Sequence, residues 1–539
     1  MSLFSRRFAA LLAAVFLMAT VSTRAEDDKA AKDKSAAPAP AADSTTQGTI
    51  DAGGQHIAYT AVAGTLTVGA TDVQDAQLGL DGKPLAGSQL ALDEPKEPKD
   101  AAPVARMFYV AYFKKDAKAE DRPITFLYNG GPGSSTVWLH MGSLGPKHVV
   151  TMGDTHLPAA PYKMVDNPYS LLDTSDLVFI DMPGTGFGRL LGKDTDKSFW
   201  GIDGDANAFA RFIVRFVTKY NRWNSPKFIF GESYGTTRSA VLADLLENRH
   251  DMDLNGVILL SQIFNFTTDI DMPDANPGVD LPYEMGLPTY AATAWYHKKL
   301  TTQPAALEPF LAEVEQFAMG PYAHALALGT DLSAEEKQQT AEKLHEYTGL
   351  PVAYWIKANL RVNGGEFEKT LQDDANLTTG RLDTRYSGPH LDPLSQSAEY
   401  DPQSSAISSA YVSLFNDYVR RDLKYGEGQT YMPEIYGEAH WDFKHHGNDI
   451  GVNVANDLAE AMKINPRLRV MVNGGYYDLA TPFFTAQYED KHLRIPQSLA
   501  KNIEYDWYEA GHMVYVSDDC LKQLHDRVAA FIKSADSAR

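Results

Sequence analysis

The stretch that decides the fold of this 539-residue chain is Lys227-Phe228-Ile229-Phe230-Gly231-Glu232-Ser233-Tyr234-Gly235. An apolar strand runs into a G-x-S-x-G pentapeptide, and helical periodicity follows it. The two glycines permit a turn so tight that the serine projects above the sheet, where a base and a substrate can reach its hydroxyl. The pentapeptide alone occurs by chance, but in this context it predicts acyl-transfer chemistry at Ser233.

The rest of the chain alternates between apolar runs and amphipathic segments. Short strands with polar alternation between Thr49 and Tyr112 predict an antiparallel start to a sheet. Continuous apolar strands then alternate with helical patterns, which indicates a mostly parallel sheet covered on both faces. The strands are expected at Ile124–Tyr128, Leu177–Ile180, Phe228–Phe230, Val257–Leu260, Leu468–Val472 and Asn502–Trp507.

This rhythm is interrupted once. From about residue 264 to 441 the chain shows helical patterns and polar loops, which we interpret as an inserted cap. A closing helix is expected from about Leu521 to Ile532. The fold class is therefore α/β, an α/β-hydrolase with a mostly parallel sheet flanked by helices and a largely helical inserted cap.

Two further residues complete a candidate catalytic triad. A serine hydroxyl needs a base within hydrogen-bond reach, and His512 lies in the loop between the last strand and the last helix. Such a base needs a carboxylate to fix its tautomer, and Asp478 follows the strand Leu468–Val472. Taken alone, each residue has a structural alternative: His512 as a surface histidine and Asp478 as a turn-forming aspartate. Their joint occurrence in the order Ser, Asp, His favours the triad.

The oxyanion hole is expected after the strand that ends at Tyr128. The loop Asn129-Gly130-Gly131-Pro132-Gly133 lets backbone N–H groups approach a developing oxyanion. We expect the donors to be the N–H groups of Gly131 and Tyr234. A nucleotide site of the G-x-G-x-x-G type is disfavoured, because no helix opens at the required spacing.

The two ends of the sequence lead to an expected domain division and location. Arg6 and Arg7 precede an apolar stretch that is too short for a membrane span, so residues 1–25 are expected to be a signal peptide. Residues 26–48 carry no large apolar side chain and are expected to be a disordered linker. The α/β-hydrolase domain is expected to occupy residues 49–539. With Cys520 as its one cysteine, an exported protein of this size suggests a bacterial envelope, periplasmic or secreted, with no stable membrane insertion after signal removal.

Charge and composition limit the partners. The formal net charge of −21 argues against binding nucleic acid or an anionic membrane. The sequence contains neither an H-E-x-x-H motif nor a paired C-x-x-C motif, so no metal and no cofactor is expected. His445 and His446 are adjacent and are interpreted as part of a solvated loop. No pattern indicates the oligomeric state.

Several of these segments together resemble the serine carboxypeptidase family. The resemblance rests on Asn129–Ser135, Asn167–Ser170, Asp181–Phe187, Gly231–Gly235 and Gly511-His512-Met513-Val514, on both sides of the cap. The segment Leu287–Tyr296 resembles the bacterial branch. The resemblance implies that Asn129 and Glu232 bind the C-terminal carboxylate of a peptide substrate.

Three positions differ from the family pattern. The second glutamate of the family is replaced by Ser143, which leaves the pH preference open, and the cysteine after Gly-Pro-Gly is replaced by Ser134. The proline after His-Met-Val is replaced by Tyr515, which alters one wall of the pocket.

The leading hypothesis is a serine-type carboxypeptidase that acts through an acyl-enzyme on Ser233. An esterase or acyltransferase with the same triad is one alternative, since the fold supports many acyl chemistries. A catalytically silent envelope binding protein is another. The side-chain preference and the physiological substrate are not readable from the pattern.

Overall fold

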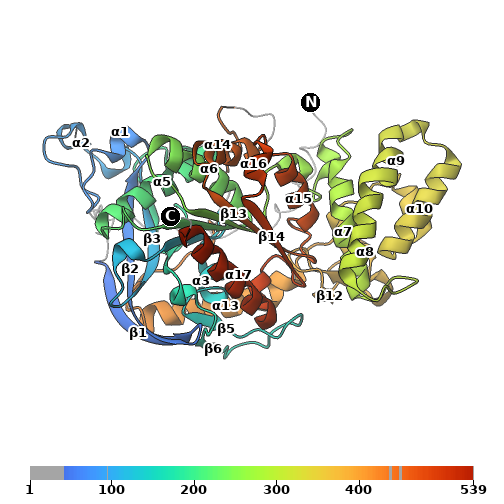
Figure 1. Ribbon diagram of the computed structural model, residues 1–539, viewed down its shortest axis with the longest axis horizontal. Coiled ribbons are helices and arrows are strands. Elements are labelled where there is room, and N and C mark those ends of the chain that lie inside the picture. The colour runs from blue at the N-terminus through green and yellow to red at the C-terminus, as the bar shows by residue number, and fades with distance from the viewer. Residues whose placement is uncertain (1–41, 94, 436–439, 448–451, 538–539) are drawn as a thin grey trace, which may run out of the picture. The chain divides into compact units, whose positions relative to one another are not determined.

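Ten described strands form one sheet in the computed structural model, with the spatial order β1-β2-β3-β7-β4-β9-β10-β13-β14 and β8 paired to β3 (Figure 1). The first four strands of this order pair antiparallel, and the strands from β7 to β14 pair parallel. The sequence prediction of an antiparallel start followed by a parallel sheet is confirmed. The strands are β1 Ser44–Ala52, β2 Gln55–Gly69, β3 Val104–Lys114, β4 Ile124–Tyr128, β7 Asp176–Ile180, β8 Arg189–Leu191, β9 Lys227–Glu232, β10 Gly256–Leu260, β13 Arg469–Gly475 and β14 Ile503–Tyr508.

The structure describes residues 42–93, 95–435, 440–447 and 452–537. The expected signal peptide and residues 26–41 of the expected linker therefore lie outside the described residues. Within the described part, the linker prediction is wrong from Ser44 onward, because Ser44–Ala52 pairs along its whole length with β2. Its polar side chains alternate outward while Ile50 and Ala52 are buried, so the strand is stabilised by pairing rather than by an apolar sequence.

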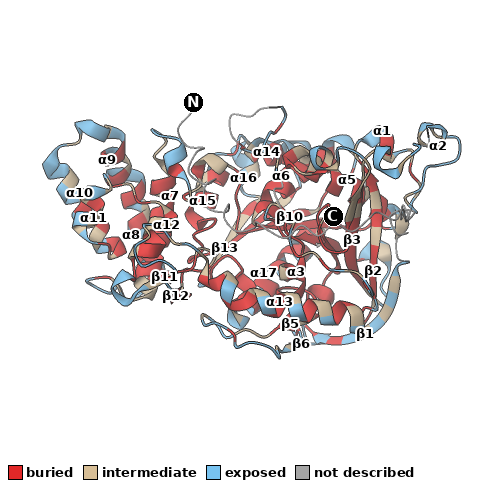
Figure 2. Ribbon diagram, turned by 180° about the vertical axis from the view of Figure 1, so that it is seen from behind, coloured by how far each residue is buried: buried red, intermediate tan, exposed pale blue. Residues whose placement is uncertain are grey.

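Helices cover both faces of the sheet (Figure 1). One apolar cluster joins one sheet face to α3 (Val137–Gly142), α13 (Pro402–Arg421) and α17 (Asp518–Ser537). The other cluster joins the opposite face to α5 (Ile202–Lys219), α6 (Tyr234–Arg249) and α14 (Ala455–Ile464). The parallel strands β4, β7, β9 and β10 are buried along their whole length, as continuous apolar runs require, whereas the edge strand β14 is mostly half-buried (Figure 2).

Most of the helices between β10 and β13 build a third apolar cluster of their own. It is formed by α7 Leu281–Tyr296, α8 Leu307–Phe317, α9 Ala323–Leu328, α10 Ala334–Thr348, α11 Val352–Lys357 and α12 Gly364–Thr370, together with α15 Phe483–Lys491 from beyond β13. The long helix α13 also lies in this insertion, but it packs into the first cluster under the sheet. The separate helical lobe therefore contains fewer residues than the cap expected at residues 264–441.

Shorter elements decorate the loops. They are α1 Asp72–Asp75, α2 Gln89–Leu92, α4 Thr195–Phe199, α16 Gln497–Ala500 and the two small hairpins β5 Lys147–Val149 with β6 Met164–Asp166 and β11 Leu377–Thr379 with β12 Ser387–Pro389. Among the described helices, none is both long enough and apolar enough to span a bilayer.

Candidate active site

Ser233 occupies the sharp turn between β9 and α6. Its backbone has φ +60° and ψ −130°, a conformation that a residue with a side chain rarely adopts. The backbone before and after the turn lies very close together. A Cβ atom added at Gly231 would be 2.2 Å from the carbonyl oxygen of Gly235. The backbone N–H of Ser233 donates to the carbonyl of Leu260 at 2.9 Å, which fixes the turn to the neighbouring strand. This is the nucleophile elbow expected from the sequence.

His512 and Asp478 lie together at the ends of β14 and β13. Nδ1 of His512 contacts Oδ2 of Asp478 at 2.8 Å, and both side chains are buried. Thr481 fixes the carboxylate, because its N–H donates to Oδ1 at 3.0 Å and its hydroxyl donates to Oδ2 at 2.7 Å. Burial alone would lower the pKa of His512, but the nearby Asp478 carboxylate outweighs burial and the pKa is raised.

Ser233 and His512 line the same cavity, which has a volume of about 240 Å³. Within the described residues, no hydrogen bond joins the Ser233 hydroxyl to His512. Such bonds are often long until a substrate is bound. The cavity is also lined by Asn129, Gly130, Gly131, Ser134, Trp138, Glu232, Arg381, Leu382, Ser404, Ile407, Ser408, Glu434 and Met513.

The glycine-rich loop after β4 lies directly against the start of α6. A Cβ added at Gly130 would lie 2.4 Å from the backbone nitrogen of Tyr234, so only glycine permits this approach. Tyr234 is the first residue of α6, and its N–H therefore has no acceptor within the helix. Gly131 lines the cavity beside Ser233. The geometry thus brings both expected oxyanion donors next to the elbow.

Glu232 is a buried carboxyl group in the wall of the same cavity. Burial raises its pKa to about 7, and His512 together with hydrogen bonds from Tyr515 and Asn129 opposes part of that rise. The Tyr515 hydroxyl donates to Oε2 of Glu232 at 2.8 Å. Asn129 is fixed from the other side, because its Oδ1 accepts from the N–H of Leu139 at 2.9 Å.

Ser143 does not replace the missing glutamate. Its side chain is fully buried, and its hydroxyl donates back to the carbonyl of Leu139 at 2.6 Å. The group that contacts Glu232 is instead Tyr515, another of the three residues that depart from the family pattern. The sequence showed that Tyr515 changes the pocket wall, but it gave no sign of a partner 283 positions away.

A buried ion pair that lies behind the glycine-rich loop after β4 was not predicted from the sequence. Nε of Arg238 lies 2.6 Å from Oδ2 of Asp205, and both side chains are fully buried. Arg238 also donates to the backbone carbonyl of Asn129 at 2.7 Å. This pair therefore fixes Asn129, the residue at which the glycine-rich loop begins. Arg238 and Asp205 lie in two helical segments without a shared motif, so no sequence signal joined them.

A larger cavity of about 530 Å³ lies in the helical lobe and contains none of the expected site residues. Its lining comes largely from the loops before α7, after α9 and after α11, among them Asp274, Asp280 and Arg361. Among the described residues, the metal-ligating side chains that gather closely are Asp203, His445 and His446, and these do not line the cavity at Ser233.

Comparison of the chain with models of known protein families shows to which family it belongs. The model that describes the serine carboxypeptidase family matches residues 99–535, which include every expected site residue. The chain belongs to the serine carboxypeptidase family. This match covers the sheet from β3 to β14 and the helical insertion, while β1 and β2 lie before it.

Individual relatives match shorter regions. A serine carboxypeptidase-like protein of Oryza sativa subsp. japonica is 31% identical over 133 residues, which are 24% of this chain and 28% of that protein. A carboxypeptidase Y homolog of Arthroderma benhamiae is 29% identical over 143 residues, which are 26% of each chain. The chain thus spans little more than a quarter of the length of these curated relatives.

A solved structure supports the fold over almost the whole chain. A prohormone-processing carboxypeptidase from Saccharomyces cerevisiae superposes with a TM-score of 0.51 and 12% identity. The superposition covers 88% of this chain and 91% of that one. At this identity the comparison establishes the α/β-hydrolase fold.

Proposed function

We propose that this protein is a serine-type carboxypeptidase that releases C-terminal residues from peptides. The observation that carries the proposal is the position of Glu232. A buried carboxyl group with a raised pKa lines one cavity with Ser233 and His512, and it is bonded by Tyr515. A protonated Glu232 can donate a hydrogen bond to a substrate carboxylate, which is the group that distinguishes a chain end from an internal peptide bond.

In the proposed reaction, Ser233 Oγ attacks the last peptide carbonyl while its proton passes to His512. Asp478 holds the imidazole in the required tautomer and stabilises the imidazolium. The carbonyl oxygen becomes an anion that accepts hydrogen bonds from the N–H groups of Gly131 and Tyr234. His512 then gives the proton to the leaving amine, and the C–N bond breaks. Water, deprotonated by His512, hydrolyses the acyl-enzyme and restores Ser233.

Recognition of the free carboxylate is assigned to Asn129 and Glu232. The Asn129 amide donates at any pH, whereas Glu232 donates only when protonated. We further assign to Tyr515 the role of holding Glu232, because its hydroxyl donates to one of the two carboxyl oxygens. With Ser143 turned into the helix backbone, Tyr515 takes over the contact that a second glutamate makes in relatives.

The pH dependence follows from these protonation states. The pKa of Glu232 is about 7, so its proton is present below that pH and is lost as the pH rises through it. An ionised Glu232 would repel the substrate carboxylate, and KM should therefore rise above about pH 7. Because this contact is made in the ground state, the change should appear mainly in KM.

The location and the domain division are part of the proposal. The basic and apolar start of the sequence supports export with removal of residues 1–25, to the periplasm or the exterior of a bacterium. The substrate is proposed to be a peptide that enters between the sheet and the helical insertion. No cofactor and no nucleic acid is required by the proposed reaction.

The experiment is a product-ladder assay on unmodified peptides with the purified full chain. Mass spectrometry should show products shortened one residue at a time from the C-terminus. The ladder should vanish in Ser233→Ala and after fluorophosphonate labelling of the serine. Internal cleavage would contradict a carboxypeptidase, turnover of esters alone would favour an esterase or acyltransferase, and no labelling of Ser233 would favour a silent binding protein.

A further inference from the structure

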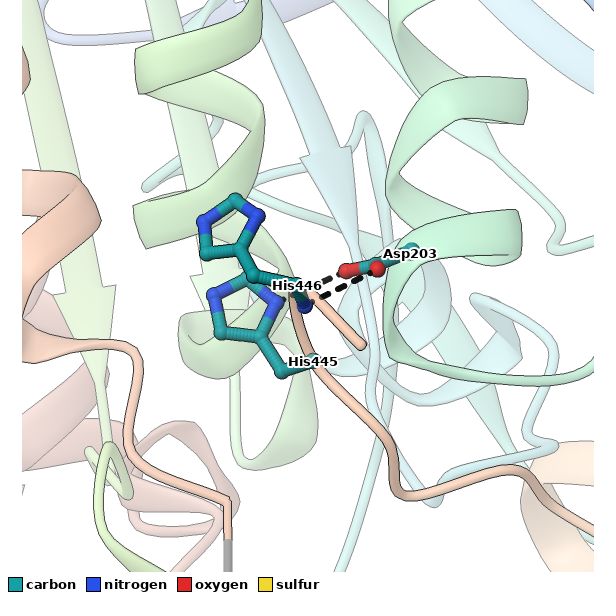
Figure 3. Close-up of side chains that lie close together, drawn as sticks. All are labelled: Asp203, His445 and His446. Atoms are coloured by element: carbon teal, nitrogen blue, oxygen red, sulfur yellow. Dashed lines mark hydrogen bonds and ion pairs between the residues drawn. The ribbon is translucent and has the colours of Figure 1, made fainter. Parts of the chain in front are cut away.

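Two histidines and two aspartates meet away from the catalytic cavity, at the starts of α5 and α14. Asp203 lies in the first turn of α5 and Asp457 in the first turn of α14. His445 and His446 come from the segment 440–447, and their rings lie with centroids 3.9 Å apart (Figure 3). The prediction that both histidines are solvated is correct for His446, whose side chain is 62% exposed, and wrong for His445, which is buried.

One carboxylate holds both imidazoles from the same side. Nε2 of His445 lies 2.9 Å from Oδ2 of Asp457, and Nε2 of His446 lies 3.1 Å from Oδ1. Asp457 itself is buried. When a carboxylate binds the N–H at Nε2, the lone pair of the ring is left at Nδ1. Histidines that bind metals commonly have this arrangement, with a carboxylate on the far nitrogen.

The second carboxylate lies on the other side of His445. Oδ1 of Asp203 is 2.7 Å from Nδ1 of His445, and Figure 3 shows this carboxylate facing the two histidines. Ligand atoms of Asp203, His445 and His446 all lie within 4.8 Å of one another. Among the described residues, Nδ1 of His446 has no hydrogen-bond partner. Two imidazoles and one carboxylate therefore gather here, and the free Nδ1 lone pair among them is that of His446.

We propose that Asp203, His445 and His446 bind a divalent transition-metal ion of the Zn²⁺ type, with Asp457 orienting both imidazoles. Nδ1 of His445 and Oδ1 of Asp203 lie at hydrogen-bond distance, and a metal ion that takes both atoms as ligands would displace the proton they share and move them slightly apart. Imidazole nitrogens select zinc and its neighbours over Mg²⁺ and Ca²⁺, which prefer oxygen ligands. The exposure of His446 leaves room for water as the remaining ligand.

The expected role of the metal ion is to hold in place the segment that packs against Tyr234, one of the two proposed oxyanion donors. The segment that carries the histidines also carries Trp441, whose ring lies edge-on to Tyr234 with centroids 5.3 Å apart. The backbone of Asp442 accepts from the N–H of Ile202 at 3.0 Å, so the segment is already tied to α5. A bound ion would join α5 to this segment directly, and through Asp457 it would also strengthen the contact of the segment with α14. The metal should therefore raise thermal stability and leave the peptide chemistry to Ser233.

The test is metal uptake by the purified full chain after removal of metals with a chelator. ZnCl₂ should bind with about one ion per chain and raise Tm by about 2 °C, and MgCl₂ should do neither. His446→Gln should abolish both effects; its exposed position makes it a safe change for folding. Asp457→Asn should weaken the affinity about 10- to 100-fold, because the orienting carboxylate is lost.

His324→Gln is the matched control, since His324 is an exposed histidine on α9, in the helical lobe. Binding that is equal in His446→Gln and in the unmodified protein would overturn the proposal, as would the absence of Zn²⁺ uptake. Loss of uptake in His324→Gln would show that exposed histidines in general bind the ion and would overturn it as well.

Discussion

Tyr515→Phe removes one hydroxyl whose consequences can be worked out from the structure. The hydroxyl donates to Oε2 of Glu232 at 2.8 Å, and both side chains are buried. Asn129 also bonds Glu232, while His512 and Asp478 act on it electrostatically with opposite signs. The substitution leaves all of these in place. It therefore changes one contact to the carboxyl group that is proposed to bind the substrate.

The magnitude follows from the two protonation states of Glu232. A hydrogen bond to a charged group contributes about 1.5–3 kcal/mol and one to a neutral group about 0.5–1.5 kcal/mol. Loss of the bond thus disfavours the anion by about 1–1.5 kcal/mol more than the acid, which corresponds to about 1 pH unit. The pKa of Glu232 should rise, and the increase of KM should move to a pH higher by about 1 unit. Below that pH, KM should be about 2- to 10-fold higher because Glu232 is held less firmly.

The assay is KM and kcat for one free-acid peptide from pH 5 to 9. Tyr411→Phe is the matched control, because Tyr411 is also buried near Glu232 but its hydroxyl has no hydrogen-bond partner among the described residues. The control should keep the pH midpoint of the unmodified protein. An unchanged midpoint in Tyr515→Phe, or an equal displacement in Tyr411→Phe, would refute the assigned role.

Four further changes have defined outcomes. Ser233→Ala and Asp478→Asn should each lower kcat/KM by on the order of 10³ or more in a protein that unfolds at nearly the same temperature; near-full activity of Asp478→Asn would exclude this carboxylate. Glu232→Gln provides a donor that does not titrate, so KM should become nearly independent of pH between 5 and 9, and a retained rise would point to another group. Deletion of residues 42–52 should lower Tm in calorimetry, because it exposes the edge of β2 and removes the buried side chain of Ile50, and an unchanged Tm would mean that β1 contributes nothing to stability.

The parallel strands were predictable because their signal is local. The strands β4, β7, β9, β10 and β13 begin as short runs of apolar residues, and the ends of every predicted strand, β14 included, lie within three residues of the observed ends. The strand β1 was not predictable in the same way. Its first residues are Ser, Thr and Gln, and it forms because the long strand β2 offers its backbone groups along one edge.

The candidate triad was located from the order of strand ends, and the structure brings His512 and Asp478 into contact. What the sequence could not provide was contact between distant segments. Tyr515 bonds Glu232 across 283 positions, and His445 bonds Asp203 across 242. No periodicity or spacing connects such pairs, because only the packing of whole helices and strands decides which side chains meet.

The most direct measurement compares two peptides that differ only at the C-terminus, one as the free acid and one as the amide. Recognition by Asn129 and a protonated Glu232 predicts rapid removal of the last residue from the acid near pH 6, and cleavage of the amide that is abolished or strongly reduced. The preference should decline as the pH rises above about 7, with the change in KM. Equal rates on the acid and the amide would contradict recognition of a chain end at this cavity.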